Sequence, residues 1–357
     1  MQYIINWLRE RIEKDAQLAM LLFSLLAIFF VLLMFGQMLA PLLVAIALAY
    51  VLDGVVVLFE RCRMPHLLAI SLTIAGALLI AIFAMLAVIP LLVQQIGSLV
   101  SNTPAYIKAI SEQIHHLQAN HAEWINSQYL QDTIAAMVTK LQEWGGALLS
   151  FSISSIPGMI TLLVYAVLVP VLVFFLLKDK HQLMAWGQQF LPRERSLLHR
   201  VWHELDAQIG NYIRGKFWEA LLVGVAMWAV YAFMGHEYAL LLGVLTGLSV
   251  WIPFVGAAVV TIPVVLLSFF QWGWGDTLLY SILAYAVVQT IDANLVVPWL
   301  FSEMVNLHPI AIIVAVLVFG NWMGILGVIV AIPLAALVKS VLSIILERRQ
   351  QPEPAQD

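Results

Sequence analysis

Apolar residues fill long uninterrupted stretches of this chain, with the polar positions gathered between them. A helix needs about 20 mostly apolar residues to cross the hydrocarbon core of a bilayer. Nine stretches meet or approach that length: 17–36, 38–59, 67–92, 156–177, 217–235, 238–252, 256–271, 276–298 and 308–346. The last is too long for one span, so we predict an all-α, polytopic membrane protein with about eight transmembrane helices and one re-entrant hairpin.

Two of the predicted segments are interrupted by glycine and proline. Pro253 and Gly256 separate the short stretches 238–252 and 256–271, and Gly320 and Gly324 divide the last stretch. Broken helices are tolerated at membrane depth where they are buried or line a cavity. We therefore interpret these four residues as candidate hinges or gates. The spacing of Gly320 and Gly324 favours simple close packing of helices, and a hinge or gate is the alternative.

Two longer segments are not apolar enough to span a membrane. Residues 93–155 have helical apolar stripes, with Asn102 and Thr103 placed to cap a helix whose first turn holds Pro104. Residues 178–216 are amphipathic and basic, typical either of a helix on anionic headgroups or of a solvated linker. We divide the chain at these segments into 1–92, 93–155, 156–177, 178–216, 217–346 and a disordered tail, 347–357.

The composition excludes several classes of protein. Of 357 residues, 62% are hydrophobic and 11% are charged, with a net charge of −4. A water-soluble domain carries about 25% charged residues, so a soluble enzyme and a basic nucleic-acid binder are excluded. One cysteine allows no intrachain disulfide, and His115, His116 and His121 match no zinc spacing. No catalytic or ATP-binding motif appears, so we expect no enzyme activity, no metal and no cofactor.

The positive charges predict the orientation. Alternating the predicted spans places fifteen of the seventeen Lys and Arg residues on one side, seven of them in residues 178–216. Loops rich in Lys and Arg stay in the cytoplasm. We therefore expect both termini to be cytoplasmic and residues 93–155 to lie outside.

Basic residues are absent between Lys216 and Lys339, although acidic residues occur there. Glu219 is predicted to be interfacial, Glu237 to lie in an exposed turn and Asp276 to cap a helix. Asp292 stands deep in an apolar run, with the amides of Gln289 and Asn294 nearby and Pro298 freeing backbone groups. Ionisable groups inside a membrane are costly and often functional. Asp292 is therefore either a proton or cation acceptor or a hydrogen-bonded structural carboxylate, and Glu303 and His308 are weaker candidates for the same pathway.

Four blocks of sequence resemble the autoinducer-2 exporter family, and within it the PerM-type permeases of Gram-negative bacteria. They are Phe174-Phe-Leu-Leu-Lys-Asp179, Asn211-Tyr-Ile-Arg-Gly-Lys216, Ile252-Pro-Phe-Val-Gly256, and the run from Asn306-Leu-His-Pro309 through Gly324-Ile-Leu-Gly327 to Ala331-Ile-Pro-Leu-Ala335. Lys178, Asp179, Arg214 and Gly215 fall in the first two blocks, at the predicted cytoplasmic boundary. Pro298, His308 and Pro309 fall in the last, and we add Pro298 and Pro309 to the candidate hinges.

The resemblance implies a homo-oligomeric transporter of the bacterial inner membrane, whose relatives are described as exporters or as sodium/proton antiporters. Many members have glycine shortly after the proline that matches Pro298, where this chain has Phe301-Ser302-Glu303. Our first hypothesis is a secondary transporter that moves a small polar solute or ion, driven by a proton or sodium gradient. The alternative is a membrane scaffold or assembly factor that docks partners through residues 93–155.

Overall fold

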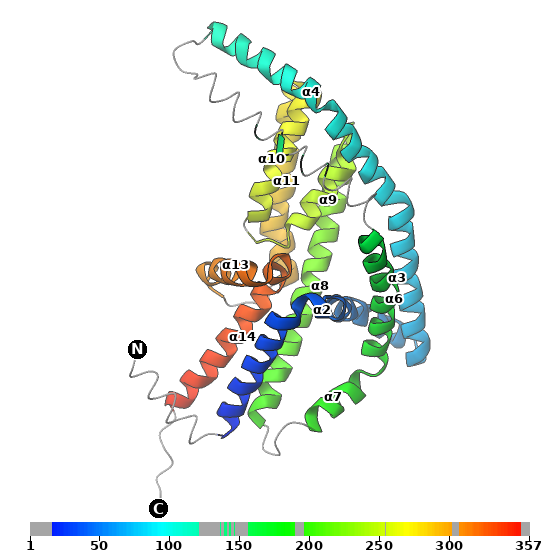
Figure 1. Ribbon diagram of the computed structural model, residues 1–357, viewed down its shortest axis with the longest axis vertical. Coiled ribbons are helices and arrows are strands. Elements are labelled where there is room, and N and C mark those ends of the chain that lie inside the picture. The colour runs from blue at the N-terminus through cyan, green and yellow to red at the C-terminus, as the bar shows by residue number, and fades with distance from the viewer. Residues whose placement is uncertain are drawn as a thin grey trace, which may run out of the picture.

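The computed structural model describes residues 16–120, 156–189, 196–253, 255–301 and 307–350, with isolated positions between 136 and 146. Every regular element in these ranges is helical (Figure 1). Five helices there are long and apolar enough to cross a membrane: Met38–Arg61, His66–Tyr106, Asp206–Phe233, Val255–Trp272 and Asp276–Phe301. Four shorter helices are also apolar: Leu163–Lys178, Ala239–Ser249, Pro309–Met323 and Gly327–Ser340. The predicted all-α, polytopic architecture is confirmed.

Helix α2, Ala16–Arg61, joins the first two predicted spans into one element of 46 residues. The predicted break between residues 36 and 38 is therefore wrong. Pro41 lies inside the helix, where its ring removes one backbone hydrogen bond and crowds the preceding turn. The ribbon bends along its length, as proline inside a helix explains (Figure 1).

Helices α3 (His66–Phe83) and α4 (Ile89–Asn120) continue one another through a short π-helix, Ala84–Val88. The predicted helix start at Pro104 is wrong, because α4 runs through it and Thr103 Oγ1 donates to the Leu99 carbonyl, 2.9 Å away. The packing around Tyr106 accounts for the difference. Its ring stacks on Phe270 with 4.3 Å between centroids, and its hydroxyl lies 2.7 Å from that of Tyr238.

Helix α6 (Ile156–Lys178) matches its predicted span and is followed by α7, Lys180–Gln189. Helix α8, Ser196–Phe233, is 38 residues long and begins inside the predicted cytoplasmic segment. At about 1.5 Å per residue it extends for about 57 Å, which exceeds the hydrocarbon core of about 30 Å. Helices α4 and α8 thus cross the expected boundaries at 92/93 and 216/217 without a break.

Helix α8 packs with α9 (Ala239–Ser249), α10 (Val255–Trp272) and α11 (Asp276–Ile291) in an antiparallel bundle (Figure 1). The α8–α9 turn, which contains His236, contacts the end of α10. There Gln271 donates a hydrogen bond to Gly235 O and accepts one from Glu237 N. We call this end of the bundle the His236 end. The opposite end holds the α9–α10 turn and, at the C-terminus of α11, a π-helix at Asp292–Val296 followed by α12, Val297–Phe301. We call it the Asp292 end.

Glycines allow α8 and α9 to approach closely. A Cβ atom on Gly243 would lie 2.8 Å from Gly224 O, and one on Gly247 would lie 2.6 Å from Ala220 O. The eleven residues of α9 extend for about 16 Å, about half of the hydrocarbon core. Helix α9 is therefore held against α8 as a half-length helix inside the bundle.

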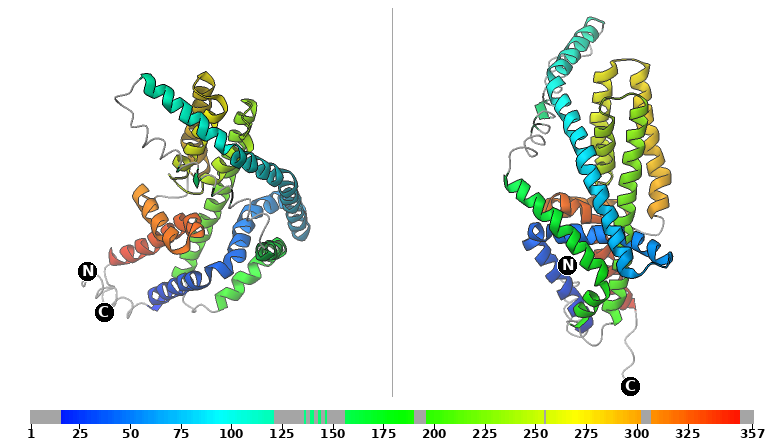
Figure 2. Two further views of the ribbon diagram at one scale, coloured as in Figure 1. Left: turned by 45° about the horizontal axis from the view of Figure 1, so that its top comes forward. Right: turned by 90° about the vertical axis from the view of Figure 1, so that its right-hand side faces the viewer.

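The last stretch forms a helical hairpin of α13 (Pro309–Met323) and α14 (Ile325–Gln350) beyond the Asp292 end (Figure 2). Gly324 ends α13 with φ of +63°, a conformation that favours glycine. A Cβ atom on Gly327 would lie 1.9 Å from Phe319 O, so the arms touch backbone to backbone. The predicted break is confirmed at Gly324, whereas Gly320 lies within α13.

Candidate functional site

A cavity of about 580 Å³ lies at the Asp292 end of the bundle. Its walls come from α8, the α9–α10 turn, α11–α12 and the two arms of the hairpin. The polar lining consists of Tyr212, Lys216, Glu219, Ser249, Gln289 and Asp292, and the apolar lining includes Pro253, Pro298 and Phe301. We call it the Asp292 cavity.

Among the described residues, three charged side chains face this cavity. Lys216 and Glu219 are one turn apart on α8 and form an ion pair with 2.7 Å between Nζ and Oε2. Lys216 Nζ also donates to Val250 O at 2.9 Å and lies 5.2 Å from the centre of the Phe301 ring. Lys216, Glu219 and Asp292 are 8%, 3% and 8% exposed. Counted as ionised, the three carry a formal charge of −1.

Glu219 Oε2 has no hydrogen-bond partner among the described residues but is ion-paired with Lys216 Nζ. Two further buried polar atoms of the cavity also lack a hydrogen-bond partner among the described residues: Asp292 Oδ1 and the hydroxyl of Tyr212. An unsatisfied buried polar atom costs about 1–3 kcal/mol, and more if it is charged. Native proteins keep few such atoms, and these two lie in the same cavity. The arrangement suits a bound species that donates hydrogen bonds or carries positive charge.

Asp292 is the first residue of the π-helix, which local sequence explains. Pro298, two residues after the π-helix, cannot donate a backbone hydrogen bond and crowds the carbonyl four residues earlier. The other π-helix, Ala84–Val88, likewise ends two residues before a proline, Pro90. The wider π turn accommodates the proline without breaking the helix and turns Asp292 toward the cavity.

The structure brings some of the predicted pathway residues together and separates others. Gln289 and Asp292 line the cavity. Asn294 does not, because its side chain is exposed and donates to Thr290 O at 2.8 Å. His308 is exposed and caps α13, with Nδ1 accepting from Ile310 N at 3.3 Å. Glu303 lies outside the described residues.

The candidate hinge residues have distinct positions. Pro253 and Pro298 line the cavity, and Pro309 is the first residue of α13. A Cβ atom on Gly256 would lie 1.8 Å from Ser249 O, so glycine is required for this tight α9–α10 turn. A Cβ atom on Gly320 would lie 2.9 Å from Val328 Cγ2, which places Gly320 between the hairpin arms.

The residues predicted at the cytoplasmic boundary serve helix packing. Lys178 Nζ and Asp179 Oδ1 are 4.0 Å apart at the α6–α7 junction. Arg214 donates to Asn211 Oδ1 at 2.7 Å and to Tyr50 O at 3.4 Å, which ties α8 to α2. A Cβ atom on Gly215 would lie 2.8 Å from the Phe301 ring, so this glycine lets α12 reach the cavity wall.

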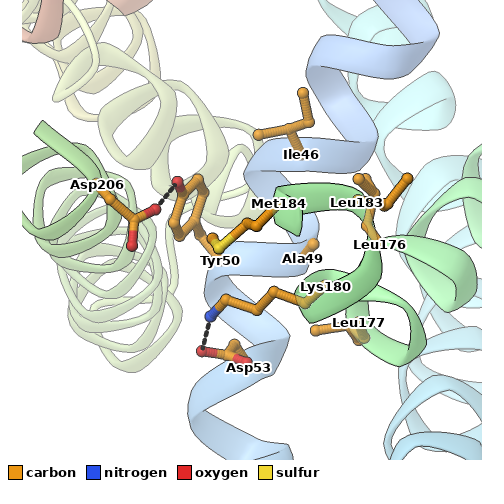
Figure 3. A pocket seen from close by; sticks show the side chains of 10 residues that line it. All are labelled: Ile46, Ala49, Tyr50, Asp53, Leu176, Leu177, Lys180, Leu183, Met184 and Asp206. Carbon is orange, nitrogen blue, oxygen red and sulfur yellow. Dashed lines mark hydrogen bonds and ion pairs between the residues drawn. The ribbon is translucent and has the colours of Figure 1, made fainter. Parts of the chain in front are cut away.

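A second pocket of about 220 Å³ lies between α2, the α6–α7 junction and α8 (Figure 3). The hydroxyl of Tyr50 donates to Asp206, and Lys180 Nζ lies 3.4 Å from Asp53 Oδ2. The rest of its lining is apolar. Because its polar groups satisfy one another, this pocket offers less to a polar ligand than the Asp292 cavity.

Sequence reasoning missed Tyr212, Lys216 and Glu219 as cavity residues. Glu219 has a basic partner although no Lys or Arg follows it before Lys339, because Lys216, one turn earlier on α8, forms the ion pair. The signal was present in the spacing. Residues four and three apart lie on one helix face, so Tyr212, Lys216 and Glu219 form a polar stripe on one side of α8.

A polytopic helical protein with a buried charged cavity at the ends of broken helices is typical of the membrane transporters. The chain belongs to the AI-2E transporter family, because residues 18–347 match the family described as “AI-2E family transporter”. It is 39% identical over 342 residues to the Escherichia coli (strain K12) protein named as permease PerM, covering 96% of this chain and 97% of that one. It is also 29% identical over 312 residues to the Bacillus subtilis (strain 168) protein named as transport protein YueF, covering 84% and 82%.

Proposed function

We propose that this protein is a secondary transporter that binds a small polar solute or cation in the Asp292 cavity and couples its movement to a proton or sodium gradient. Membership of a transporter family supports the class of function. The observation that supports the site is the unpartnered Asp292 carboxylate beside the buried Lys216–Glu219 pair. The permease and transport-protein names of the relatives favour transport over catalysis.

The charge arithmetic of the cavity is the physical basis of the proposal. Lys216 balances one of the two carboxylates, which leaves one negative charge for a cation or a proton to neutralise. An uncompensated charge in a space of low dielectric is costly, so the cavity favours the loaded state over the empty one. This preference would link binding of the transported species to the protonation or cation occupancy of Asp292.

Apolar and charged surfaces support a membrane position with both termini in the cytoplasm. Large apolar side chains are exposed on the outer helices, among them Leu79, Leu86 and Phe233. We propose that the inner-membrane bilayer and further copies of the chain cover them. Helix α7 and the N-terminal part of α8 lie at the end of the molecule opposite the α8–α9 turn (Figure 1). Lys178 ends α6, Lys180 begins α7 and Arg214 lies in the first half of α8, so the positive-inside rule assigns this end to the cytoplasm.

The test is ion-coupled flux in proteoliposomes that hold the purified protein and a pH dye. Pulses of sodium, potassium and lithium are applied to the wild type and to Asp292→Asn, which removes the charge and keeps the shape. We expect a cation-dependent pH signal that Asp292→Asn reduces at least tenfold. Asp276→Asn is the matched control, because Asp276 is exposed at the start of the same helix, and it should leave the signal unchanged.

A second variant tests the solute contact rather than the charge. Tyr212→Phe removes a hydroxyl that bonds nothing in the described part of the chain, so folding should be unaffected. If the hydroxyl contacts the transported species, the concentration for half-maximal flux rises while the amount of folded protein stays constant. Undiminished coupled flux in Asp292→Asn would refute the proposed site.

A further inference from the structure

Helix α11 carries a row of buried and half-buried polar side chains that leads away from the Asp292 cavity. Ser281, Tyr285, Gln289 and Asp292 follow one another at intervals of four, four and three residues, which places them on one face of the helix. Ser281 is 0% exposed and Tyr285 is 6% exposed. The row extends from the cavity toward the His236 end of the bundle.

At the His236 end, the row joins a cluster of four polar side chains. Ser281 Oγ lies 2.6 Å from Ser268 Oγ of α10, and Ser268 Oγ lies 3.4 Å from His236 Nε2. The hydroxyl of Tyr231, on α8, donates to Ser281 O at 3.3 Å. His236 Nδ1 accepts from Tyr238 N, and burial lowers the pKa of His236 to about 4, so its ring is neutral. The neighbouring residues Gly235 and Glu237 are exposed, so this cluster ends at the surface.

Nearer the cavity, a second cluster continues the row. The hydroxyl of Tyr285 donates to Ala257 O at 2.8 Å and accepts from Thr261 Oγ1 at 3.2 Å. Gln289 Nε2 donates to the same hydroxyl at 3.1 Å, and Gln289 and Ala257 line the Asp292 cavity. The two clusters lie one turn apart on α11 and together cover the length between the cavity and the His236 end.

These polar groups lie in the middle of the apolar core of the bundle. Met227, Leu242, Val264 and Leu267 surround them and are no more than 2% exposed. Burying hydroxyls and an imidazole among such residues is unfavourable unless each is hydrogen-bonded, and apolar residues would fill the same space at lower cost. Their alignment between a cavity and the surface is a property that a merely structural core does not require.

We propose that this seam between α8 and the α10–α11 pair is the closed half of the transport route, which fills with water when the Asp292 cavity closes. The inference rests on the proposed function of that cavity. Two of the bonds that join α10 to α11 are short, at 2.6 and 2.8 Å, and a third, from Thr261 Oγ1 to Tyr285, is 3.2 Å. The contacts of Tyr231 and His236 are longer, at 3.3 and 3.4 Å. The weaker contacts mark where the seam opens, and its uncharged hydroxyl lining suits protons, water and hydroxyl-bearing solutes.

Cysteine labelling tests the route. The single native cysteine, Cys62, is exposed and is first replaced by serine. Ser281→Cys then places a thiol of nearly the same size inside the seam, and Ala257→Cys places one in the cavity. A charged, membrane-impermeant methanethiosulfonate is applied to right-side-out and to inverted vesicles. We expect Ser281→Cys to react from one face of the membrane and Ala257→Cys from the other.

Two matched controls distinguish a water-filled route from a loosened fold. Val264→Cys is as buried as Ser281 but belongs to the apolar core, and Ala286→Cys lies on the exposed face of α11. Neither should react, because the reagent attacks thiolates in water. We expect each control variant to be labelled at least tenfold more slowly than Ser281→Cys.

The possible results distinguish failure of the proposed route from failure of the proposed function of the cavity. If coupled flux is measured but Ser281→Cys stays unlabelled from both faces, or if Val264→Cys reacts equally fast, the proposed route is wrong and the cavity proposal stands. If coupled flux is absent in the wild type, the proposed function fails, whatever the labelling shows. Labelling of Ser281→Cys from the same face as Ala257→Cys would also overturn the route.

Discussion

Replacing Lys216 by methionine is the most informative perturbation of the cavity. Methionine has a similar length and no charge, so the change removes the ammonium and leaves Glu219 and Asp292 as two buried carboxylates in one space. The Val250 carbonyl also loses the donor that lies 2.9 Å away. Breaking a buried ion pair by removing one partner costs about 3–5 kcal/mol, so we expect a loss of this size in unfolding free energy.

Replacing Glu219 by glutamine changes the charge of the cavity in the opposite direction, because it removes a negative charge. It leaves Lys216 to balance Asp292, so the formal charge of the cavity changes from −1 to zero, and the amide oxygen can still accept from Lys216 Nζ. We expect a loss of about 1 kcal/mol or less, in the range of one exchanged hydrogen bond. The double variant should recover most of the loss of Lys216→Met, because neighbouring residues that share an interaction do not add independently.

Reversible unfolding of the purified protein in mixed micelles, followed by tryptophan fluorescence, measures these differences. Lys178→Met is the matched control, since Lys178 is exposed and its nearest carboxylate, on Asp179, is 4.0 Å away; it should change the unfolding free energy by less than about 1 kcal/mol. Equal losses for Lys216→Met and Glu219→Gln would refute the charge arithmetic. An additive double variant would show that the two side chains do not interact.

Three further predictions concern pH, packing and helix geometry. Burial lowers the pKa of His236 from 6.5 to about 4. As the pH falls, this histidine therefore takes up a proton in the unfolded chain at a higher pH than in the folded chain. The unfolding free energy should fall by about 3 kcal/mol between pH 6.5 and pH 4, and His236→Gln should show a flatter pH profile. Gly247→Ala should cost about 1–3 kcal/mol in unfolding free energy because its Cβ meets Ala220 O, whereas Gly76→Ala, with nothing within 4 Å, should be neutral or stabilising. Pro298→Ala should restore regular α-helical hydrogen bonds, rotate Asp292 out of the cavity and reduce coupled flux; unchanged flux together with unchanged amide exchange from residue 292 to 296 would contradict this.

Local sequence predicted the helices well where one apolar run met a clear interruption. Gly324 ends α13 because only a residue without a side chain adopts its backbone angles easily. Gly256 and Pro253 were recognised as the α9–α10 break for similar local reasons. Helix ends failed where tertiary contacts outweighed a local signal. Pro104 lies inside α4, where the packing of Tyr106 on Phe270 holds the turn in a helical conformation.

For the site, the sequence identified Asp292, Gln289, Pro253 and Pro298, because carboxylates, amides and prolines are unusual in apolar helices. It placed Asn294 with them, and the structure does not, because residues two apart in a helix point to opposite sides, and Asn294 bonds Thr290 O instead. The partner of Glu219 was available from spacing on α8. The packing of α8 against α11 could not be read from the sequence, and it brings Lys216, Glu219 and Asp292 to one cavity.

The sequence by itself determined the class of the molecule. The length of its apolar runs and its scarcity of charge require a helical membrane protein, because backbone groups in lipid must bond within their own segment. Only the tertiary structure decided which polar residues meet. Helix pairing is set by side-chain contacts between segments far apart in the chain, such as Gly224 with Gly243 and Ser268 with Ser281, and those contacts join one buried aspartate to a cavity and to a polar seam.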